Sequence, residues 1–189
     1  MNFFRNKPTR FYIGHLLMLF STLILVGIYF PLIILYLNPP KIQANYPTST
    51  GYYLTIPKIG AQSEIISNVD PWNQSEYRKA LQKGIAHAKN TGNPGEEKTV
   101  YLFAHSSDSP WRITRQNTIF LKLDQLKPGD DITIGKDGQI YKYKVRETKI
   151  VLPSEINYLL ETSQNQLILQ TCTPIGTALK RLLVFADPT

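Results

Sequence analysis

The chain has 189 residues with a single cysteine, and its 21 lysines and arginines outnumber 14 aspartates and glutamates to give a net charge of +7. Three basic and no acidic residues precede residue 41, which leaves 18 basic and 14 acidic residues in the remainder. This small surplus, interspersed with acids, argues against a nucleic-acid-binding protein. One cysteine excludes an intramolecular disulfide.

The N-terminal region contains a long uncharged segment. Residues 11–37 carry no charged side chain and are rich in Leu, Ile, Phe and Val. At about 1.5 Å per helical residue, this segment outruns a hydrocarbon core of about 30 Å, so we predict one transmembrane helix. A cleaved signal peptide is the alternative, but its apolar region would be only about 7–15 residues long. Arg5, Lys7 and Arg10 predict that residues 1–10 form a cytoplasmic tail and that the rest of the chain lies outside.

A polar segment that contains prolines, residues 38–51, is interpreted as a linker. Residues 52–189 then have the size of one domain with an adequate core. Short apolar or alternating runs bounded by Gly, Pro, Asn and Asp are typical of strands. We expect such strands within residues 52–60, 63–67, 99–104, 131–135, 140–152, 166–171 and 180–186.

Helical patterns are few in the predicted domain. Residues 73–88 begin with an apolar face that Gly84 should interrupt, and residues 153–162 start with Pro, Ser and Glu, which is typical of a helix N-terminus. Six to eight short strands with one or two short helices predict a mainly β fold. We expect a closed or nearly closed barrel with the helices on its flank.

The single cysteine, Cys172, lies where a predicted strand ends. A lone cysteine is most often a small buried hydrophobe. Here the thiol is predicted to lie outside the cytoplasm without a partner, and Thr173 and Pro174 interrupt the strand directly after it. If the strands on either side of residues 175–177 pair, Arg181 faces Cys172. These features favour a reactive thiol at the rim of the sheet.

A thiol nucleophile also needs a base, and the predicted domain has two histidines. His105 follows the strand at 99–104, so it occupies a strand end as Cys172 does. His87 lies in a polar stretch after the first helix and is interpreted as structural or solvated. Imidazole suits proton transfer because its pKa is about 6.5. One cysteine and two histidines are too few for a zinc site.

Four segments, taken in order behind an N-terminal anchor, resemble the sortases, the membrane-anchored cysteine transpeptidases of bacterial cell surfaces. They are "LTIPKIGAQSEII", "VYLFAHSS", "FLKLDQLKPGDDITI" and "LILQTCTPIGTALKRLLVFA". The resemblance implies a closed eight-stranded β-barrel. It also implies that Cys172, His105 and Arg181 are the catalytic residues.

The same resemblance implies that the protein cleaves an LPXTG-like sorting signal through a thioacyl-enzyme and transfers the surface protein to an amine acceptor. That acceptor is a peptidoglycan stem or a pilin lysine. Residues 151–166, just before the nucleophile's strand, are the predicted specificity loop. The candidate substrate-binding residues are Ile156, Leu159, Leu160 and Thr171, although packing is an alternative for each. Contact with membrane lipid is expected through the N-terminal helix.

Some features depart from the family pattern. Ala104 precedes His105 where the family often has glycine. Residues 68–73, "NVDPWN", are similar to the Asp-Pro-aromatic lid of pilus-building sortases but follow the first strands, so we interpret them as a turn that opens a helix. Asp108, Asp130 and Asp131 do not match a calcium site convincingly, and we predict no cofactor. The short loop after Cys172 and the absence of an extension after Thr189 favour housekeeping class D or E.

Two other functions stay open. One is another cysteine acyltransferase, such as an L,D-transpeptidase, but "LQTCTP" lacks the histidine and glycine that precede the cysteine in those enzymes. The other is a non-catalytic, membrane-anchored β-domain that binds a surface partner, with Cys172 as a packing residue.

Overall fold

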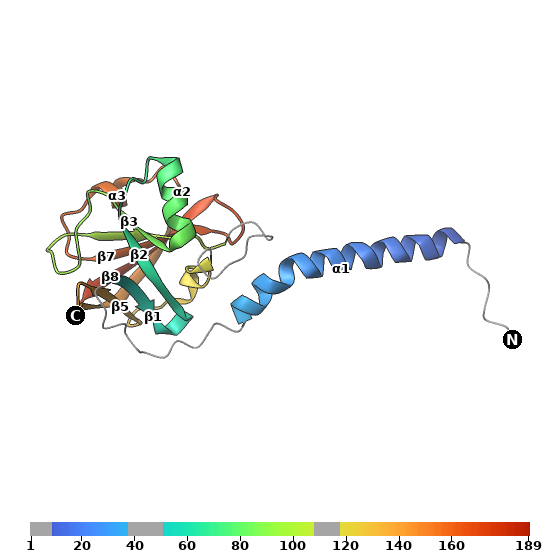
Figure 1. The fold of residues 1–189 in the computed structure, drawn as a ribbon, viewed down its shortest axis with the longest axis horizontal. Helices are drawn as coiled ribbons and strands as arrows, with labels where there is room; N and C mark the ends of the chain where they lie inside the picture. The colour runs from blue at the N-terminus through green and yellow to red at the C-terminus, as the bar shows by residue number, and fades with distance from the viewer. Residues whose placement is uncertain (1–8, 38–50, 108–117) are drawn as a thin grey trace. The chain divides into compact units, whose positions relative to one another are not determined.

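The computed structural model describes residues 9–37, 51–107 and 118–189 (Figure 1). It divides into two compact units, residues 1–38 and 39–189, which we describe separately. Residues 1–8 of the predicted tail, almost all of the predicted linker and Asp108 lie outside the described residues, and the last two tail residues, Thr9 and Arg10, belong to the helix of the first unit.

The first unit contains one long helix. This helix, α1, covers Thr9–Leu37 and has no acidic residue in its first turn and no basic residue in its last turn. Among the described residues it is the one helix long and apolar enough to cross a membrane, with a candidate span at Thr9–Phe30 and a mean hydropathy of 2.1. The predicted apolar helix is therefore present.

The second unit is a closed β-barrel. The described residues form eight strands in the order β1-β2-β3-β4-β7-β8-β6-β5, which confirms the predicted eight-stranded barrel. The strands are β1 (Tyr52–Ile56), β2 (Ala61–Val69), β3 (Ile85–Ala88), β4 (Val100–Phe103), β5 (Asp131–Lys136), β6 (Gln139–Val151), β7 (Leu167–Thr173) and β8 (Lys180–Pro188). The helical elements are η1 (Pro57–Ile59), α2 (Gln74–Lys83), η4 (Leu123–Gln125) and α3 (Asn157–Leu160).

Two of the strand pairs are parallel, and one of them positions the site. β2 pairs with β3, and β4 pairs with β7, in parallel orientation. The remaining pairs around the barrel are antiparallel, including the β1–β2 hairpin predicted from the sequence. Parallel strands end at the same edge of a sheet, so the residues that follow β4 lie at the edge where β7 ends.

Helix α2 begins and ends where the sequence predicts. The side chain of Asn73 accepts a hydrogen bond from the backbone N–H of Glu76, which caps the first turn. Gly84 ends the helix, and a Cβ atom there would lie 2.4 Å from the carbonyl oxygen of Glu64, so the close approach requires glycine. Figure 1 shows α2 on the outside of the barrel, where it contacts β2 and β3. The predicted flanking helix is therefore present.

Strand β3 is an element that the sequence analysis did not predict. Its four residues, 85–88, are all buried, so they show no alternation of apolar and exposed positions. His87 therefore lies inside a strand and is 5% exposed, which corrects its placement in a polar stretch. The solvated interpretation of His87 is wrong, and the structural one holds.

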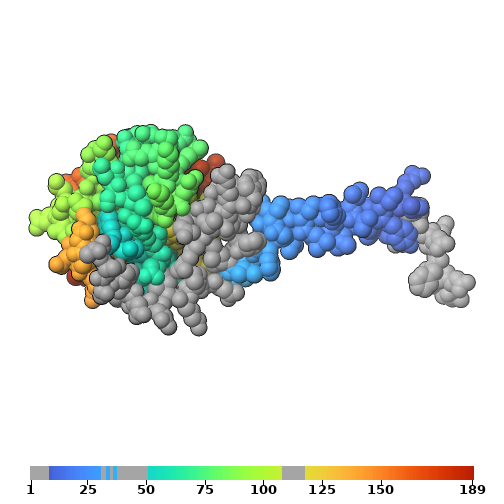
Figure 2. Space-filling model, viewed as in Figure 1, coloured from blue at the N-terminus to red at the C-terminus, as the bar shows by residue number. Residues whose placement is uncertain are grey.

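The segment before α2 is a turn, as predicted. The backbone N–H of Trp72 donates to Asp70 Oδ1 at 2.9 Å, and the N–H of Asp70 donates to Glu76 Oε1 at 2.9 Å. The first hydrogen bond closes the turn, and the second connects it to the first turn of the helix. Figure 2 shows the residues of β2 and α2, coloured teal to green, forming much of the visible surface of the domain.

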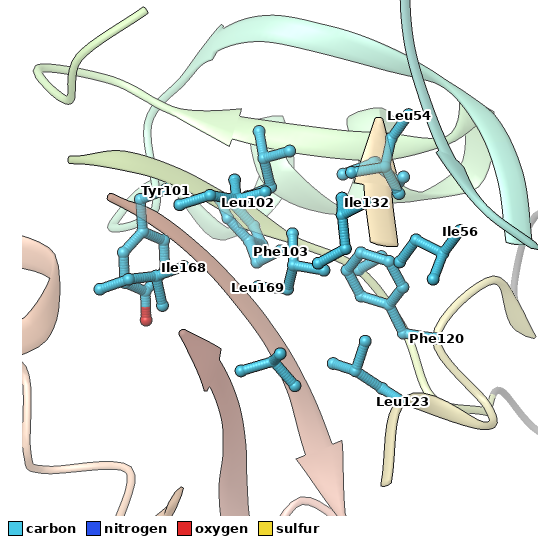
Figure 3. Close-up of a cluster of buried hydrophobic side chains, with 14 of the residues drawn as sticks. Leu54, Ile56, Tyr101, Leu102, Phe103, Phe120, Leu123, Ile132, Ile168 and Leu169 are labelled. Atoms are coloured by element: carbon cyan, nitrogen blue, oxygen red, sulfur yellow. The ribbon is translucent and has the colours of Figure 1, made fainter. Parts of the chain in front are cut away.

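The barrel interior is filled by apolar side chains from all around the sheet. Figure 3 shows part of this core, in which Leu102 and Leu169 from paired positions of β4 and β7 lie among side chains of other strands. The buried neighbours labelled there include Leu54, Ile56, Phe120, Leu123 and Ile132. Alternation along β7 then places Ile168, Gln170 and Cys172 on the outer face.

Candidate active site

His105 and Cys172 lie at the same edge of the barrel, where β4 and β7 end. Phe103 pairs with Gln170, and the backbone N–H of Ala104 donates to the carbonyl of Gln170 at 3.1 Å. Extending this register by two residues places His105 beside Cys172. His105 is half-buried, and its carbonyl accepts a hydrogen bond from the N–H of Phe120 at 3.2 Å.

Arg181 reaches the same edge from the other side of β7. It pairs directly with Cys172 in the antiparallel β7–β8 ladder, as the sequence predicts. The thiol is free and half-buried. Arg181 Nη1 donates to the carbonyls of Ala178 at 3.0 Å and Lys180 at 3.1 Å, so the guanidinium is held against the loop between the two strands.

Thr171 connects the strand of the cysteine to the strand of the histidine. Its hydroxyl donates to the carbonyl of Ala104 at 2.9 Å, and the side chain is 4% exposed. Each partner directly precedes one of the two candidate catalytic residues. Of the two roles that the sequence left open for Thr171, this burial supports packing over substrate contact.

The loops that follow the two strands are also connected. The backbone N–H of Gly176, in the loop after Cys172, donates to Ser107 Oγ at 2.8 Å. Gly176 has a φ of +81°, a conformation that L-residues rarely adopt. The loops that carry the ends of β4 and β7 therefore share a hydrogen bond near the thiol.

The outer face beside Cys172 carries a polar pair that the sequence analysis missed. The hydroxyl of Tyr101 donates to Gln170 Oε1 at 2.7 Å across β4 and β7. Burial raises the pKa of Tyr101 well above its ordinary value, whereas the nearby Arg181 lowers it by a smaller amount. The tyrosine is therefore a neutral donor. Alternation in "LILQTC" placed Gln170 on the face of Cys172, but nothing in the sequence alone indicated its partner.

The predicted specificity loop lies beside this face, and its helix is shorter than expected. Only residues 157–160 are helical, as α3. Ile156 and Leu160 are exposed, whereas Leu159 is partly buried against the core. These placements make Ile156 and Leu160 available to a ligand, and they support packing for Leu159.

The loop is fixed to the barrel through Tyr158. Its ring packs edge-on against Phe185 of β8, with centroids 5.6 Å apart, and its hydroxyl is hydrogen-bonded to Lys149 of β6. A cavity of about 300 Å³ opens between the loop and the sheet, with Ile168 and Phe185 in its lining. Ile168 and Phe185 are paired residues of β7 and β8, so this cavity lies on the face that carries Cys172 and Arg181.

His87 has a structural role and does not belong to the candidate site. Its Nε2 is 2.9 Å from the carbonyl of Gly92, and its Nδ1 is 3.2 Å from the hydroxyl of Tyr52. A carbonyl can only accept, so Nε2 carries the proton and Nδ1 accepts from the tyrosine. Burial lowers the pKa of His87. The side chain thus connects β3 to Tyr52 of β1 and to the loop that follows β3.

The two described acidic candidates for calcium binding, Asp130 and Asp131, both interact with protein groups. Asp130 accepts from the N–H of Lys127 at 2.8 Å, and Asp131 pairs with Lys144 at 2.7 Å. Within the part of the chain that the structure describes, no group of three or more His, Cys, Asp or Glu residues is arranged to hold a metal ion.

Comparisons with known proteins identify the family of this chain. The family model described as the sortase domain matches residues 54–189. Sortase C from Clostridium perfringens SM101 is 29% identical, with 72% of this chain and 68% of that chain covered and a TM-score of 0.57. A lid mutant of sortase A from Corynebacterium diphtheriae is 27% identical, with 83% and 77% covered and a TM-score of 0.61. Sortase C-1 from Actinomyces oris is 28% identical, with 75% of each chain covered and a TM-score of 0.60. No curated protein matches the chain at a significant level.

Proposed function

The chain belongs to the sortase family and is a cysteine transpeptidase, and from this premise we propose that Cys172, His105 and Arg181 carry its reaction. The observation that supports these three roles is the meeting of β4, β7 and β8 at one edge. The β4–β7 register, extended by two residues, brings His105 level with Cys172, and the β7–β8 ladder pairs Cys172 with Arg181.

In the first half-reaction, the thiolate of Cys172 attacks the carbonyl carbon of the scissile peptide bond. The C–N bond then breaks, a thioester forms, and His105 gives a proton to the departing amine. Arg181 donates hydrogen bonds to the developing oxyanion or to the substrate backbone, a role worth about 3–4 kcal/mol where single donors have been removed elsewhere.

In the second half-reaction, an incoming amine attacks the thioester. His105 takes a proton from this amine, a new amide bond forms, and Cys172 is released as a thiolate. Dividing one difficult step into two lowers each barrier. We propose an LPXTG-like sorting signal as the acyl donor and a peptidoglycan stem or a pilin lysine as the amine acceptor. Class D or E stays our prediction for the subclass.

The proposed cellular setting follows from the first unit. Helix α1 is a candidate membrane span, as expected for a membrane-anchored sortase. We propose that residues 1–10 are cytoplasmic and that residues 52–189 act outside the membrane, because Arg5, Lys7 and Arg10 precede the span. The surface protein would then be joined to the envelope close to the membrane.

A thiol-labelling experiment separates this function from that of a non-catalytic β-domain. The folded full-length chain in detergent is treated with methyl methanethiosulfonate and analysed by intact mass spectrometry. A nucleophile at the barrel edge should react under native conditions, and Cys172→Ala should not. A thiol that reacts only after denaturation would contradict the proposal and favour the packing role.

A further inference from the structure

We propose that Gln170 is a specificity-determining residue whose side-chain amide donates a hydrogen bond to an acceptor side chain of the sorting signal, near the bond that Cys172 attacks. The inference rests on the proposed function, because it takes Cys172 as the residue that bonds the substrate. It adds a requirement on the substrate's sequence that the catalytic residues do not impose.

Gln170 lies on the outer face of the barrel, next to Cys172 along β7. Gln170 and Cys172 point to the same face of β7, and at about 3.3 Å per residue they are about 6.6 Å apart along the strand. An extended peptide has the same spacing. The strand ends at Thr173, directly after Cys172. The surface of β7 that can lie under an extended acyl segment is therefore the part that precedes Cys172 and includes Gln170.

Tyr101 fixes the orientation of the carboxamide. Its hydroxyl donates to Gln170 Oε1 at 2.7 Å, and Tyr101 is 3% exposed. Because Oε1 is the acceptor in this bond, the NH₂ group is the free end of the side chain. Within the described part of the chain, Nε2 of Gln170 donates no hydrogen bond. The side chain of Gln170 is half-buried on the outer face of the barrel. Tyr101 is therefore a positioning residue for Gln170.

The surroundings of this donor make it selective. Its neighbours on the outer face include Phe103, Ile168 and Leu183, which are buried and apolar. An apolar substrate side chain placed over Gln170 would leave a desolvated donor without a partner, whereas a hydroxyl, amide or carboxylate oxygen would satisfy it. We expect the enzyme to prefer an acceptor over an apolar side chain of the same shape by about three- to tenfold at that position.

The test uses the full-length chain in detergent with Leu-Pro-X-Thr-like peptides. Each of the three positions before the cleaved residue is varied between Thr and Val, which have nearly the same shape, and the initial rate of thioester formation is measured. In the wild-type chain, one of the three positions should favour Thr by about three- to tenfold. In Gln170→Leu this ratio should fall to within about twofold of unity, and in Tyr101→Phe it should decrease.

Two further variants complete the design. Gln139→Leu is the matched control, since Gln139 is an exposed residue at the start of β6, and its Thr-to-Val ratio should equal that of the wild type. If Gln170→Leu does not fold, Gln170→Glu keeps the acceptor for Tyr101 but removes the donor, so the rate with Asp relative to Asn at that position should fall below the wild-type ratio.

The outcomes separate the two proposals. A wild-type chain without any Thr preference would overturn the role of Gln170 and leave the transpeptidase intact. The same conclusion would follow from a Thr preference that persists in Gln170→Leu, or from an Asp-to-Asn ratio that is unchanged in Gln170→Glu. Absence of a thioester with every peptide in the wild-type chain would overturn the proposed sorting-signal reaction, and this inference with it.

Discussion

Thr171 donates its hydroxyl to the carbonyl oxygen of Ala104 at 2.9 Å, and this hydrogen bond joins the residues that directly precede Cys172 and His105. The two strands run parallel, so a single cross-strand contact at their ends sets the relative height of the thiol and the imidazole. The hydrogen bond is buried, which makes its loss costly.

We expect Thr171→Val to slow the reaction without changing the substrate affinity. The variant leaves the carbonyl of Ala104 without its partner, which should lower the free energy of unfolding by about 1–3 kcal/mol. A small displacement of the reacting groups should reduce the acylation rate about tenfold. Thr171→Ser keeps the hydroxyl and should retain both properties. Single-turnover kinetics would measure the effect, and wild-type rates in Thr171→Val would show that this bond does not position the site.

The two histidines should respond differently to substitution. His105→Ala should slow thioester formation by about two orders of magnitude, because proton transfer to the departing amine is lost. His87→Ala should change the rate of the folded enzyme only mildly, yet lower the free energy of unfolding by at least about 1–3 kcal/mol, because its two partners lose their hydrogen bonds. Acylation rates and denaturant unfolding of both variants test this. The opposite ranking of rates would mean that His87 is the base.

His87 should also make the stability of the domain depend on pH. Burial lowers the pKa of His87 in the folded chain, so the unfolded chain takes up its proton first as the pH falls. The contribution of His87 to the free energy of unfolding is therefore constant above the ordinary histidine pKa of about 6.5. This contribution decreases as the pH falls from there toward the lowered pKa of the folded chain. Thermal unfolding at pH 7.5 and pH 5.0 should show a larger loss for the wild type than for His87→Gln. Equal losses would argue against this contribution.

The segment before β7 should determine the peptide preference. Replacing residues 153–162 with the matching segment of a sortase of different specificity, while keeping Tyr158 and Leu159 as barrel contacts, should shift the preferred peptide and leave thiol labelling intact. Ile156→Ala and Leu160→Ala should raise KM with little loss of stability, since both side chains are exposed. Peptide-library acylation is the readout. A folded chimera that still labels at Cys172 and keeps its original preference would place recognition outside residues 153–162.

The parts of the fold that the sequence predicted well have strong local signals. Alternation in "LILQTC" and "KRLLVFA" predicted β7 and β8, and the short loop between them predicted that Cys172 and Arg181 would face each other, as they do. Asn73 begins the first helix of the domain by capping, which is a sequence-local effect, and Gly84 ends it. The register of an antiparallel pair with a short loop is set locally, so it can be read from the sequence.

The parts that the sequence did not predict depend on contacts between distant segments. β3 is four buried residues, too short for a periodic pattern, and its parallel pairing with β2 fixes it as a strand. The parallel β4–β7 pairing joins residues more than 60 positions apart, so neither the bond from Thr171 to Ala104 nor the bond from Tyr101 to Gln170 was visible in the sequence. Only four residues of the predicted second helix are helical, and contacts of Tyr158 with β6 and β8 hold that segment.

The central claim is that Cys172 forms a thioester with a sorting signal. The most direct measurement is intact mass spectrometry of the full-length chain in detergent after incubation with Leu-Pro-X-Thr-like peptides. The account predicts a mass increase equal to the acyl segment, located on Cys172, reversed by hydroxylamine and absent in Cys172→Ala, which should keep its fold because the thiol is half-buried at the barrel edge. Peptide cleavage at an unchanged rate in Cys172→Ala would contradict the account.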